Sequence, residues 1–200
     1  MILSPESILY IVLIIITVDY LFEQMLDYIN MKARKSELPE EIKSFYDEEK
    51  YAKSQRYHKV LSKFSFLTSA FSFILSFAII SLGFFGDLDA WMRSFIDDEI
   101  ILSLSYFGIL FVASDIINTP FQLYSTFVIE EKFGFNKTTV KTFVIDKLKG
   151  YVLTAIIGGL LIGTLLYLIL ELGEDFWLYF WVIASVFILF INMFYTSLIL

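Results

Sequence analysis

Five apolar runs, each close to 20 residues long, constrain this chain more than any other feature of its sequence. They cover approximately residues 7–28, 64–86, 100–124, 151–170 and 176–199. An α-helix rises about 1.5 Å per residue, so about 20 apolar residues cross the roughly 30 Å hydrocarbon core of a bilayer. The runs therefore predict an all-α, multi-pass membrane protein with five transmembrane helices.

The composition also indicates that the chain lies in a lipid bilayer. Of the 200 residues 58% are hydrophobic and 18% are charged, with a mean hydropathy of +0.71. Soluble domains average about half apolar and about a quarter charged residues. Cysteine is absent, which excludes disulfides, thiolate metal ligands and a cysteine nucleophile. No basic residues precede the first run and no small-residue cleavage site follows it, so we interpret it as a retained anchor.

Lysine and arginine are distributed so unevenly that they predict an orientation. Nine of the fifteen lie between the first and second runs, and five lie between the third and fourth. Under the positive-inside rule, segments 29–63 and 125–150 are cytosolic, the N-terminus is outside or lumenal, and the C-terminus is cytosolic. The predicted location is a bacterial inner membrane or a eukaryotic ER membrane. The bilayer is then the first partner, and no nucleic acid is expected.

Both cytosolic segments are predicted to contain helices. Pro39 can begin a helix with Glu40 and Glu41 in its first turn, and the later part of this segment continues into the second run. In the other segment, Asn136 or Thr138 can cap an amphipathic helix. Its apolar side would carry Val140, Phe143, Val144 and Leu148, and its basic side Lys141, Lys147 and Lys149. Such a helix lies at the membrane surface or docks on a cytosolic domain.

Four polar residues interrupt the apolar runs: Asp19, Asp115, Asn118 and Asn192. Each would be costly facing lipid, so each is expected to face the interior of the bundle or a water-filled cavity. They could line a hydrated chamber, or they could form structural hydrogen bonds between helices. Pro120 can kink the third run near Asn118 and so help to shape a cavity.

The residues of this chain do not favour a catalytic metal site or a catalytic nucleophile. His58 is the single histidine, so a His-Glu-x-x-His zinc motif cannot be assembled. A serine nucleophile with a histidine base fails for the same reason, because His58 lies in a charged segment. We predict no catalytic and no metal-ligating residue in this chain, and an ordinary role for His58.

The stretch "FVIEEKFGFN" follows the third run and mixes charged with aromatic residues. Its candidate docking residues are Phe127, Glu130, Glu131, Lys132, Phe133, Phe135 and Asn136. The charges alone would suit a solvated helix end. The three phenylalanines require an apolar contact at the same place, which favours a segment packed under another domain.

Two stretches carry a family resemblance. "LYSTFVIEEKFGFNKTT" resembles the membrane-embedded N-terminal region of the integral-membrane CAAX prenyl proteases, which are zinc metallopeptidases. "PEEIKSFYDEEKYAKSQRYHKVLSKFSF" is similar to the first cytosolic stretch of that family. The resemblance covers nearly the whole chain. It implies that residues 1–200 form the N-terminal transmembrane domain of such a metalloendopeptidase, as part of a seven-helix barrel around an intramembrane chamber.

The resemblance also implies what this chain lacks. The family carries its zinc motif beyond the fifth helix, so zinc is expected in the full-length parent and not in this chain, which should be inactive alone. The five spans would form part of the chamber wall, and the docking residues, exposed in this chain, would hold the C-terminal peptidase domain. Substrates would be prenylated or other membrane-associated polypeptides. A substrate-contact role for the docking residues is less favoured. A stand-alone, non-enzymatic scaffold or transporter-like module is the alternative function.

Overall fold

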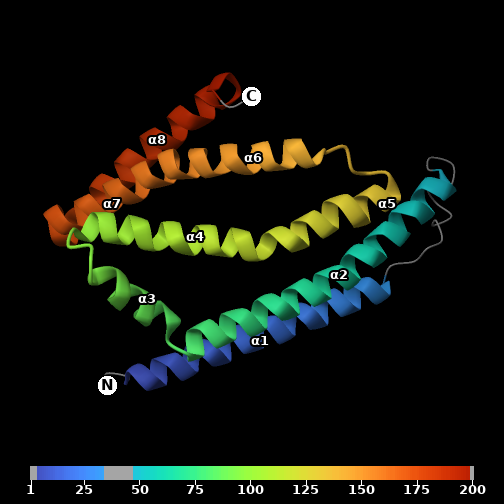
Figure 1. Cartoon of the computed structure of the whole chain (residues 1–200), viewed down its shortest axis with the longest axis horizontal. Helices are drawn as coiled ribbons and strands as arrows, with labels where there is room; N and C mark the ends of the chain where they lie inside the picture. The colour runs from blue at the N-terminus through green and yellow to red at the C-terminus, as the bar shows by residue number, and fades with distance from the viewer. Residues whose placement is uncertain (1–3, 34–46, 199–200) are drawn as a thin grey trace. The chain divides into compact units, whose positions relative to one another are not determined.

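The computed structural model describes residues 4–33 and 47–198, with side chains up to Met193. The described residues form helices joined by short turns and contain no strand, so the predicted all-α class is confirmed (Figure 1). The helix predicted to begin at Pro39 lies outside the described residues.

The N-terminal half begins with two long helices, α1 (Pro5–Ala33) and α2 (Glu48–Ser81). A short helix α3 (Phe84–Arg93) leads to α4 (Glu99–Tyr124), which continues through a π-helical segment η2 (Ser125–Glu130) into α5 (Glu131–Phe133). The π-helical segment follows Pro120, which has no N–H to donate to the helix.

The C-terminal half is a second long helical path. It comprises α6 (Val140–Leu153), a π-helical segment η3 (Thr154–Gly158), α7 (Gly159–Leu172), a short 3₁₀ turn η4 (Gly173–Asp175) and α8 (Phe176–Leu198). No break separates α6, η3 and α7. Residues 140–149 therefore form the first turns of a long helix: the predicted helix is present and continues into the fourth run, and its location at the membrane surface or against a cytosolic domain stays a prediction.

Within the described residues, four continuous helical stretches are long and apolar enough to cross a membrane: Pro5–Ala33, Glu48–Ser81, Glu99–Phe133 and Val140–Met193. The last has 54 residues, far more than the roughly 20 that one crossing needs. It reverses at η4, where Gly173 has a φ of 56°, a conformation that glycine adopts without strain. The stretch therefore holds two of the five predicted runs.

Two predicted boundaries differ from the observed ones. The second run was expected to extend to residue 86, but α2 ends at Ser81 because Gly83, with a φ of 74°, turns the chain. Thr139, and neither Asn136 nor Thr138, caps α6: its hydroxyl accepts a hydrogen bond from the Thr142 N–H at 3.1 Å. Asn136 instead accepts from the Thr138 N–H at 2.7 Å and shapes the preceding turn.

The chain divides into two compact units. The first comprises residues 1–90 and 114–138, and the second comprises residues 91–113 and 139–200. Within the second unit Leu102 and Leu168 are buried. Gly163 of α7 admits the Leu104 side chain, whose Cδ1 would lie 3.7 Å from an added Cβ. The first unit contains three of the four intramembrane polar residues and the predicted docking segment.

Candidate functional site

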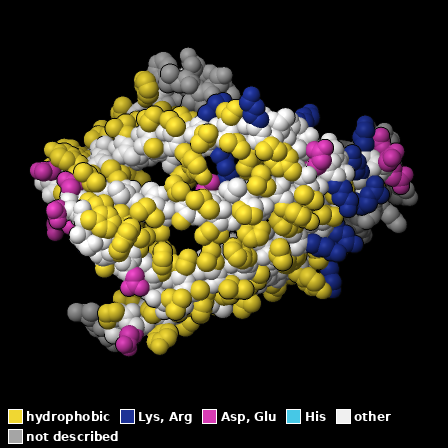
Figure 2. Space-filling view, in the orientation of Figure 1, with side chains coloured by type: hydrophobic (Ala, Val, Ile, Leu, Met, Phe, Trp, Pro, Cys, Tyr) yellow, Lys and Arg dark blue, Asp and Glu magenta, His cyan; other side chains and the backbone are white. Residues whose placement is uncertain are grey.

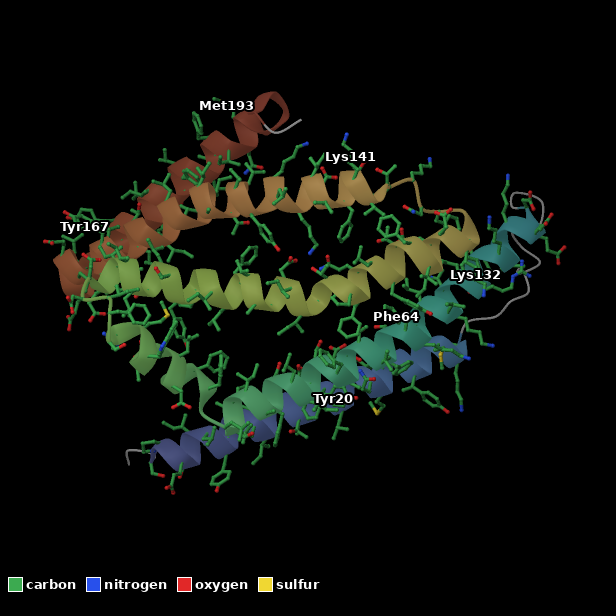
Figure 3. All side chains as sticks on the ribbon, viewed as in Figure 1. Tyr20, Phe64, Lys132, Lys141, Tyr167 and Met193 are labelled. Atoms are coloured by element: carbon green, nitrogen blue, oxygen red, sulfur yellow. The ribbon has the colours of Figure 1, made fainter. Side chains whose placement is uncertain are left out.

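Helices α1 and α2 form an antiparallel hairpin in the first unit. Gln24 Nε2 donates a 2.9 Å hydrogen bond to Ser69 Oγ, and the rings of Tyr20 and Phe73 stack with centroids 4.3 Å apart. From the first pair to the second, the residue number falls by four on α1 and rises by four on α2, so the two helices run antiparallel. Tyr20 is labelled on α1 in Figure 3. The row of α1 residues that contacts α2 is fixed by these pairs.

The opposite edge of α2 packs against the chain that follows Ser114. The ring centroids of Phe71 and Phe121 are 5.0 Å apart, and those of Phe64 and Tyr124 are 4.9 Å apart. The numbers again run in opposite directions, so α4 is also antiparallel to α2. Helix α2 therefore lies between α1 and α4 and leaves two free sides.

One free side of α2 carries hydroxyl groups, and the other is apolar. Ser65, Ser72 and Ser76 are exposed and fall about 90° around the helix from both packed edges, at about 100° per residue. On the opposite side lie Leu67 and Ile74, which are 62% and 65% exposed. A helix with one polar and one apolar free side suits a wall between water and lipid.

Helix α1 has the same two-sided character. Asp19, Glu23 and Asp27 are spaced four residues apart, are exposed, and lie roughly 70° from the row that contacts α2. Because both helices are right-handed and run antiparallel, the acidic row and the serine row lie on the same side of the hairpin.

The end of α4 continues this surface. Asn118 and Gln122 fall on the side of α4 that matches the serine row, and the half-buried Asp115 lies beside them. Asn118 Nδ2 donates to the Ser114 carbonyl at 2.8 Å, and the Thr119 hydroxyl donates to the Asp115 carbonyl at 2.7 Å. We call this surface the polar side of the first unit. It comprises Asp19, Glu23, Asp27, Ser65, Ser72, Ser76, Asp115, Asn118 and Gln122.

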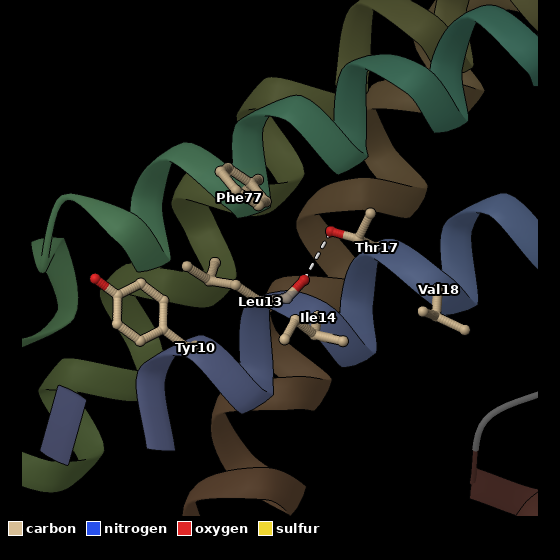
Figure 4. Close-up of a pocket in the computed structure, with 6 residues that line it drawn as sticks. All are labelled: Tyr10, Leu13, Ile14, Thr17, Val18 and Phe77. Carbon is tan, nitrogen blue, oxygen red and sulfur yellow. Dashed lines mark hydrogen bonds between the residues drawn. The ribbon is translucent and has the colours of Figure 1, made fainter. Parts of the chain in front are cut away.

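The other side, which we call the apolar side, is formed by Ile14, Leu21, Met25, Leu67 and Ile74. All five side chains are at least half exposed. Here α1 and α2 leave a groove of about 320 Å³ lined by Tyr10, Leu13, Ile14, Thr17, Val18 and Phe77 (Figure 4). The Thr17 hydroxyl donates to the Leu13 carbonyl at 2.7 Å, so it does not make the groove more polar.

The structure brings three of the four predicted intramembrane polar residues to one surface. Asp19, Asp115 and Asn118 belong to the polar side, whereas Asn192 lies in the second unit and donates to the Ile188 carbonyl of its own helix at 2.8 Å. Sequence reasoning missed Glu23 and Asp27 of α1 and the serines of α2. Their spacing of three and four residues was the signal that could have found them.

The predicted docking segment folds back onto α2. The Tyr57 ring makes edge contacts with Phe133 and Phe135, at centroid distances of 5.5 and 4.8 Å. Phe133 is 9% exposed and Ile129 only 2%. Gly134 closes the turn with a φ of 69°, and the Glu130 carbonyl accepts the Phe135 N–H at 2.9 Å.

The exposure expected of the docking residues is found for Glu131, Lys132 and Phe135, whose side chains remain accessible. It is wrong for Phe133, which is buried within the chain itself against α2. Phe127, Glu130 and Asn136 are half-buried. Asn136 Nδ2 donates to Glu131 Oε2 at 3.0 Å, which orients this carboxylate.

The same turn contacts a cation of α2. Lys53 Nζ lies 5.4 Å from the centre of the Phe135 ring, close enough for a cation–π interaction. His58 is exposed, and its ring is tilted against that of the neighbouring Tyr57 at 5.3 Å.

The described residues do not fit a zinc site. Within the described part of the chain, no three His, Cys, Asp or Glu side chains are grouped so that they could hold a metal ion.

The fold and the site define a class: an integral membrane protein built of apolar helices, with one polar side in its first unit. The family described as "CAAX prenyl protease N-terminal, five membrane helices" matches residues 27–200. The chain therefore belongs to this family, and the resemblance seen in the sequence is confirmed.

Individual relatives agree with this assignment. The chain is 33% identical to "CAAX prenyl protease 1 homolog" of Arabidopsis thaliana over 86% of its own length and 42% of that protein. It is 36% identical to "Probable CAAX prenyl protease 1" of Schizosaccharomyces pombe over 77% of its length and 35% of that protein. The crystal structure of S. mikatae Ste24p matches with a TM-score of 0.81 and 28% identity, over 93% of this chain and 45% of that one. The chain spans about two fifths of the length of these relatives.

Proposed function

We propose that this chain is the membrane-embedded N-terminal domain of a CAAX-type zinc metalloendopeptidase and forms part of the wall of its intramembrane chamber. The observation that carries the proposal is the two-sided first unit. Its polar side gathers carboxylates, amides and hydroxyls at membrane depth, where they are tolerated only toward water or protein. Its apolar side provides the surface that lipid requires. The substrates of the full-length enzyme would be prenylated or other membrane-associated polypeptides.

Cysteine labelling tests the chamber wall directly, because the chain has no native cysteine. Ser72→Cys and Ser76→Cys should react with a water-soluble maleimide in reconstituted protein. The matched control Ile74→Cys lies between the two serines in depth, on the apolar side, and should stay unlabelled. Leu67→Cys, on the same side about 7.5 Å from Ser72 along the axis, should also stay unlabelled. Equal protection of all four positions would show that no water reaches the polar side, and the chamber would have to be given up.

The turn of residues 127–136 supplies the docking surface in this proposal. Phe133, buried against Tyr57, anchors the turn to α2, while Glu131 and Lys132 are exposed and Phe135, in contact with Tyr57 and Lys53, stays partly accessible. Docking the C-terminal peptidase domain on this turn would place that domain over the cytosolic mouth of the chamber. Zinc would be held by that domain, and this chain alone would neither bind zinc stoichiometrically nor cleave peptides.

Substitutions in the full-length enzyme separate docking from substrate contact. Glu131→Ala and Phe135→Ala should lower activity, zinc content and protease resistance of the peptidase domain together, because they loosen one interface. Phe95→Ala removes an aromatic side chain that is 57% exposed and lies outside the turn, so it serves as the control. If activity fell while zinc content and protease resistance were unchanged, the turn would contact substrate and the docking role would be wrong.

The orientation is also part of the proposal. Cysteines at Ser94 and Glu174 should be labelled by an impermeant reagent from outside intact cells, and one at Thr139 should not. The basis is the placement of fourteen of the fifteen lysines and arginines in two segments. Outside labelling of Thr139→Cys would reverse the orientation and remove the cytosolic docking site.

A further inference from the structure

Four basic residues gather at one end of the apolar side of the first unit. Arg56, Lys59 and Lys63 follow one another at helical spacing on α2, and all three are exposed. They lie on the side of the helix that carries Leu67 and Ile74 in the following turns. Among the described residues, none of the three makes an ion pair. Figure 2 shows basic side chains at this end of α1 and α2, beyond apolar side chains that cover the same helices.

Helix α1 contributes the fourth cation. Lys32 falls on the apolar side of α1, in line with Met25 and Leu21. Its Nζ lies 4.7 Å from the centre of the Tyr28 ring. The register set by the Gln24–Ser69 and Tyr20–Phe73 pairs puts Lys32 level with residue 61, between Lys59 and Lys63.

The depth of these residues matches the headgroup layer. Lys63 precedes the exposed Leu67 by one helical turn, about 6 Å, and Arg56 lies about 10 Å further along the axis. A headgroup region is roughly 5–7 Å thick on each side of the hydrocarbon, which matches the spacing of about 6 Å between Lys59 and Lys63, with Lys32 level between them. Arg56 lies one turn further out, and its long side chain can extend along the helix toward this layer. Tyr28 is of the type that is enriched at this level. Glu49 is on the same side of α2 but about two turns beyond Arg56, outside this layer.

We propose that Lys32, Arg56, Lys59 and Lys63 form a surface that binds the phosphate-bearing headgroups of anionic phospholipids. Lipid is the occupant that fits, because the cations continue the exposed apolar side of the same two helices without interruption. Headgroup phosphates supply negative charge to cations that form no ion pair within residues 4–33 and 47–198. The surface faces away from the polar side, so it is independent of the chamber and of the docking turn.

Lipid selectivity of the reconstituted chain tests this surface. The chain is placed in phosphatidylcholine bilayers containing a trace of spin-labelled phosphatidylglycerol or spin-labelled phosphatidylcholine, and the immobilised fraction gives the association constant of each lipid. We expect the anionic lipid to bind about fivefold more tightly, which is the effect of about one basic side chain at an anionic surface. The preference should decrease toward equal binding in about 1 M salt, where charges are screened beyond roughly 3 Å.

Two charge-matched variants make the test specific. Lys32→Gln/Arg56→Gln/Lys59→Gln/Lys63→Gln should bind both lipids equally. The control Lys50→Gln/Lys137→Gln/Lys141→Gln/Lys149→Gln loses the same charge outside the surface and should keep the preference. Both sets replace exposed or half-buried side chains, and retained helicity checks the fold. Equal binding of both lipids by the wild-type chain, or equal loss in the two variants, would overturn the proposal.

Discussion

The α1–α2 hairpin and the α7–α8 hairpin are both pairs of long apolar helices, but different side chains hold each pair together. The first carries Asp19 and Glu23 within its apolar run and Asp27 one turn closer to the interface, and it is joined by an interhelical hydrogen bond and a ring stack. The second turns at Gly173, places Gly163 against Leu104, and has exposed apolar side chains along α8 from Trp177 to Met193. Apolar length is sufficient to make either a membrane hairpin. The first hairpin has a row of carboxylates on one side that can face water, and Asn192 is the only one of the four predicted intramembrane polar residues that lies in the second.

The difference shows which property distinguishes a helix suited to a chamber wall from one that only crosses the membrane. That property is the placement of polar residues on one side of the helix, and not its mean hydropathy. The charged groups of the first hairpin are acceptable because they share one side, where a single aqueous surface can solvate them all. The same groups scattered around a helix would each face lipid or require a separate partner.

The largest effect on membrane insertion is expected when a charge is placed on the apolar side of α2 and not on its polar side. Ile74→Asp puts a carboxylate on the apolar side of α2 and should cost about 2.5–3.5 kcal/mol of insertion free energy if the residue lies near the bilayer centre. Ser72→Asp, two residues away on the polar side, should cost much less. Insertion efficiency of α2 in microsomes measures both. Equal penalties would mean that the two sides do not differ and would break the comparison.

A smaller effect is expected from overpacking the second hairpin. Gly163→Leu should destabilise the protein by about 1–3 kcal/mol, because the added side chain collides with Leu104. Gly163→Ala is the matched control: its Cβ would lie at an ordinary 3.7 Å from Leu104 Cδ1 and should be tolerated. Thermal unfolding in detergent distinguishes the two. Full stability of Gly163→Leu would show that α7 is not held by this close approach.

The interhelical hydrogen bond of the first hairpin should contribute less. A double-mutant cycle of Gln24→Leu and Ser69→Ala should give a coupling near 0.6 kcal/mol, the average for such bonds in membranes. Unfolding free energy in mixed detergent is the measurement. A coupling indistinguishable from zero would leave the Tyr20–Phe73 stack as the main specific contact between α1 and α2.

The smallest effect concerns the helix caps outside the membrane. The Lys50 backbone N–H, and then that of Glu49, hold the pKa of the Asp47 carboxyl below its ordinary value of 3.8. The cap therefore stabilises α2 fully above this ordinary value and is lost as the pH falls through the lower pKa of the folded state. Hydrogen exchange in the first turn of α2 should increase over that range, after correction for intrinsic rates.

The cap of α6 is the internal control for this measurement. Thr139 has a hydroxyl that does not titrate, so exchange at Thr142 should follow only the intrinsic rate. A parallel increase at both helix starts would indicate general acid unfolding and not the loss of the Asp47 cap.

The sequence by itself determined that the chain lies in a lipid bilayer, that it is helical, and where its apolar runs are. These follow from length and hydropathy, because a bilayer admits only segments whose backbone hydrogen bonds close within the segment or a barrel. The phenylalanines of the "FVIEEKFGFN" stretch predicted an apolar contact, and Phe133 and Phe135 make one with Tyr57, while the docking role of the stretch stays a prediction. That Tyr57 is the partner could not be predicted, because the contact joins residues more than seventy positions apart.

The tertiary structure decided which side of each helix faces what. The hydropathy of α1 does not depend on the direction in which Asp19 points. The contacts of Tyr20 with Phe73 and of Gln24 with Ser69 fix the rotation of α1 about its own axis. The continuity of α6 with α7 was likewise not predicted, because the basic residues up to Lys149 and the apolar run from residue 151 have different hydropathy although one helix contains both. Periodicity within a helix is local and can be read from the chain, whereas the direction of a polar row depends on neighbours that only folding brings into contact.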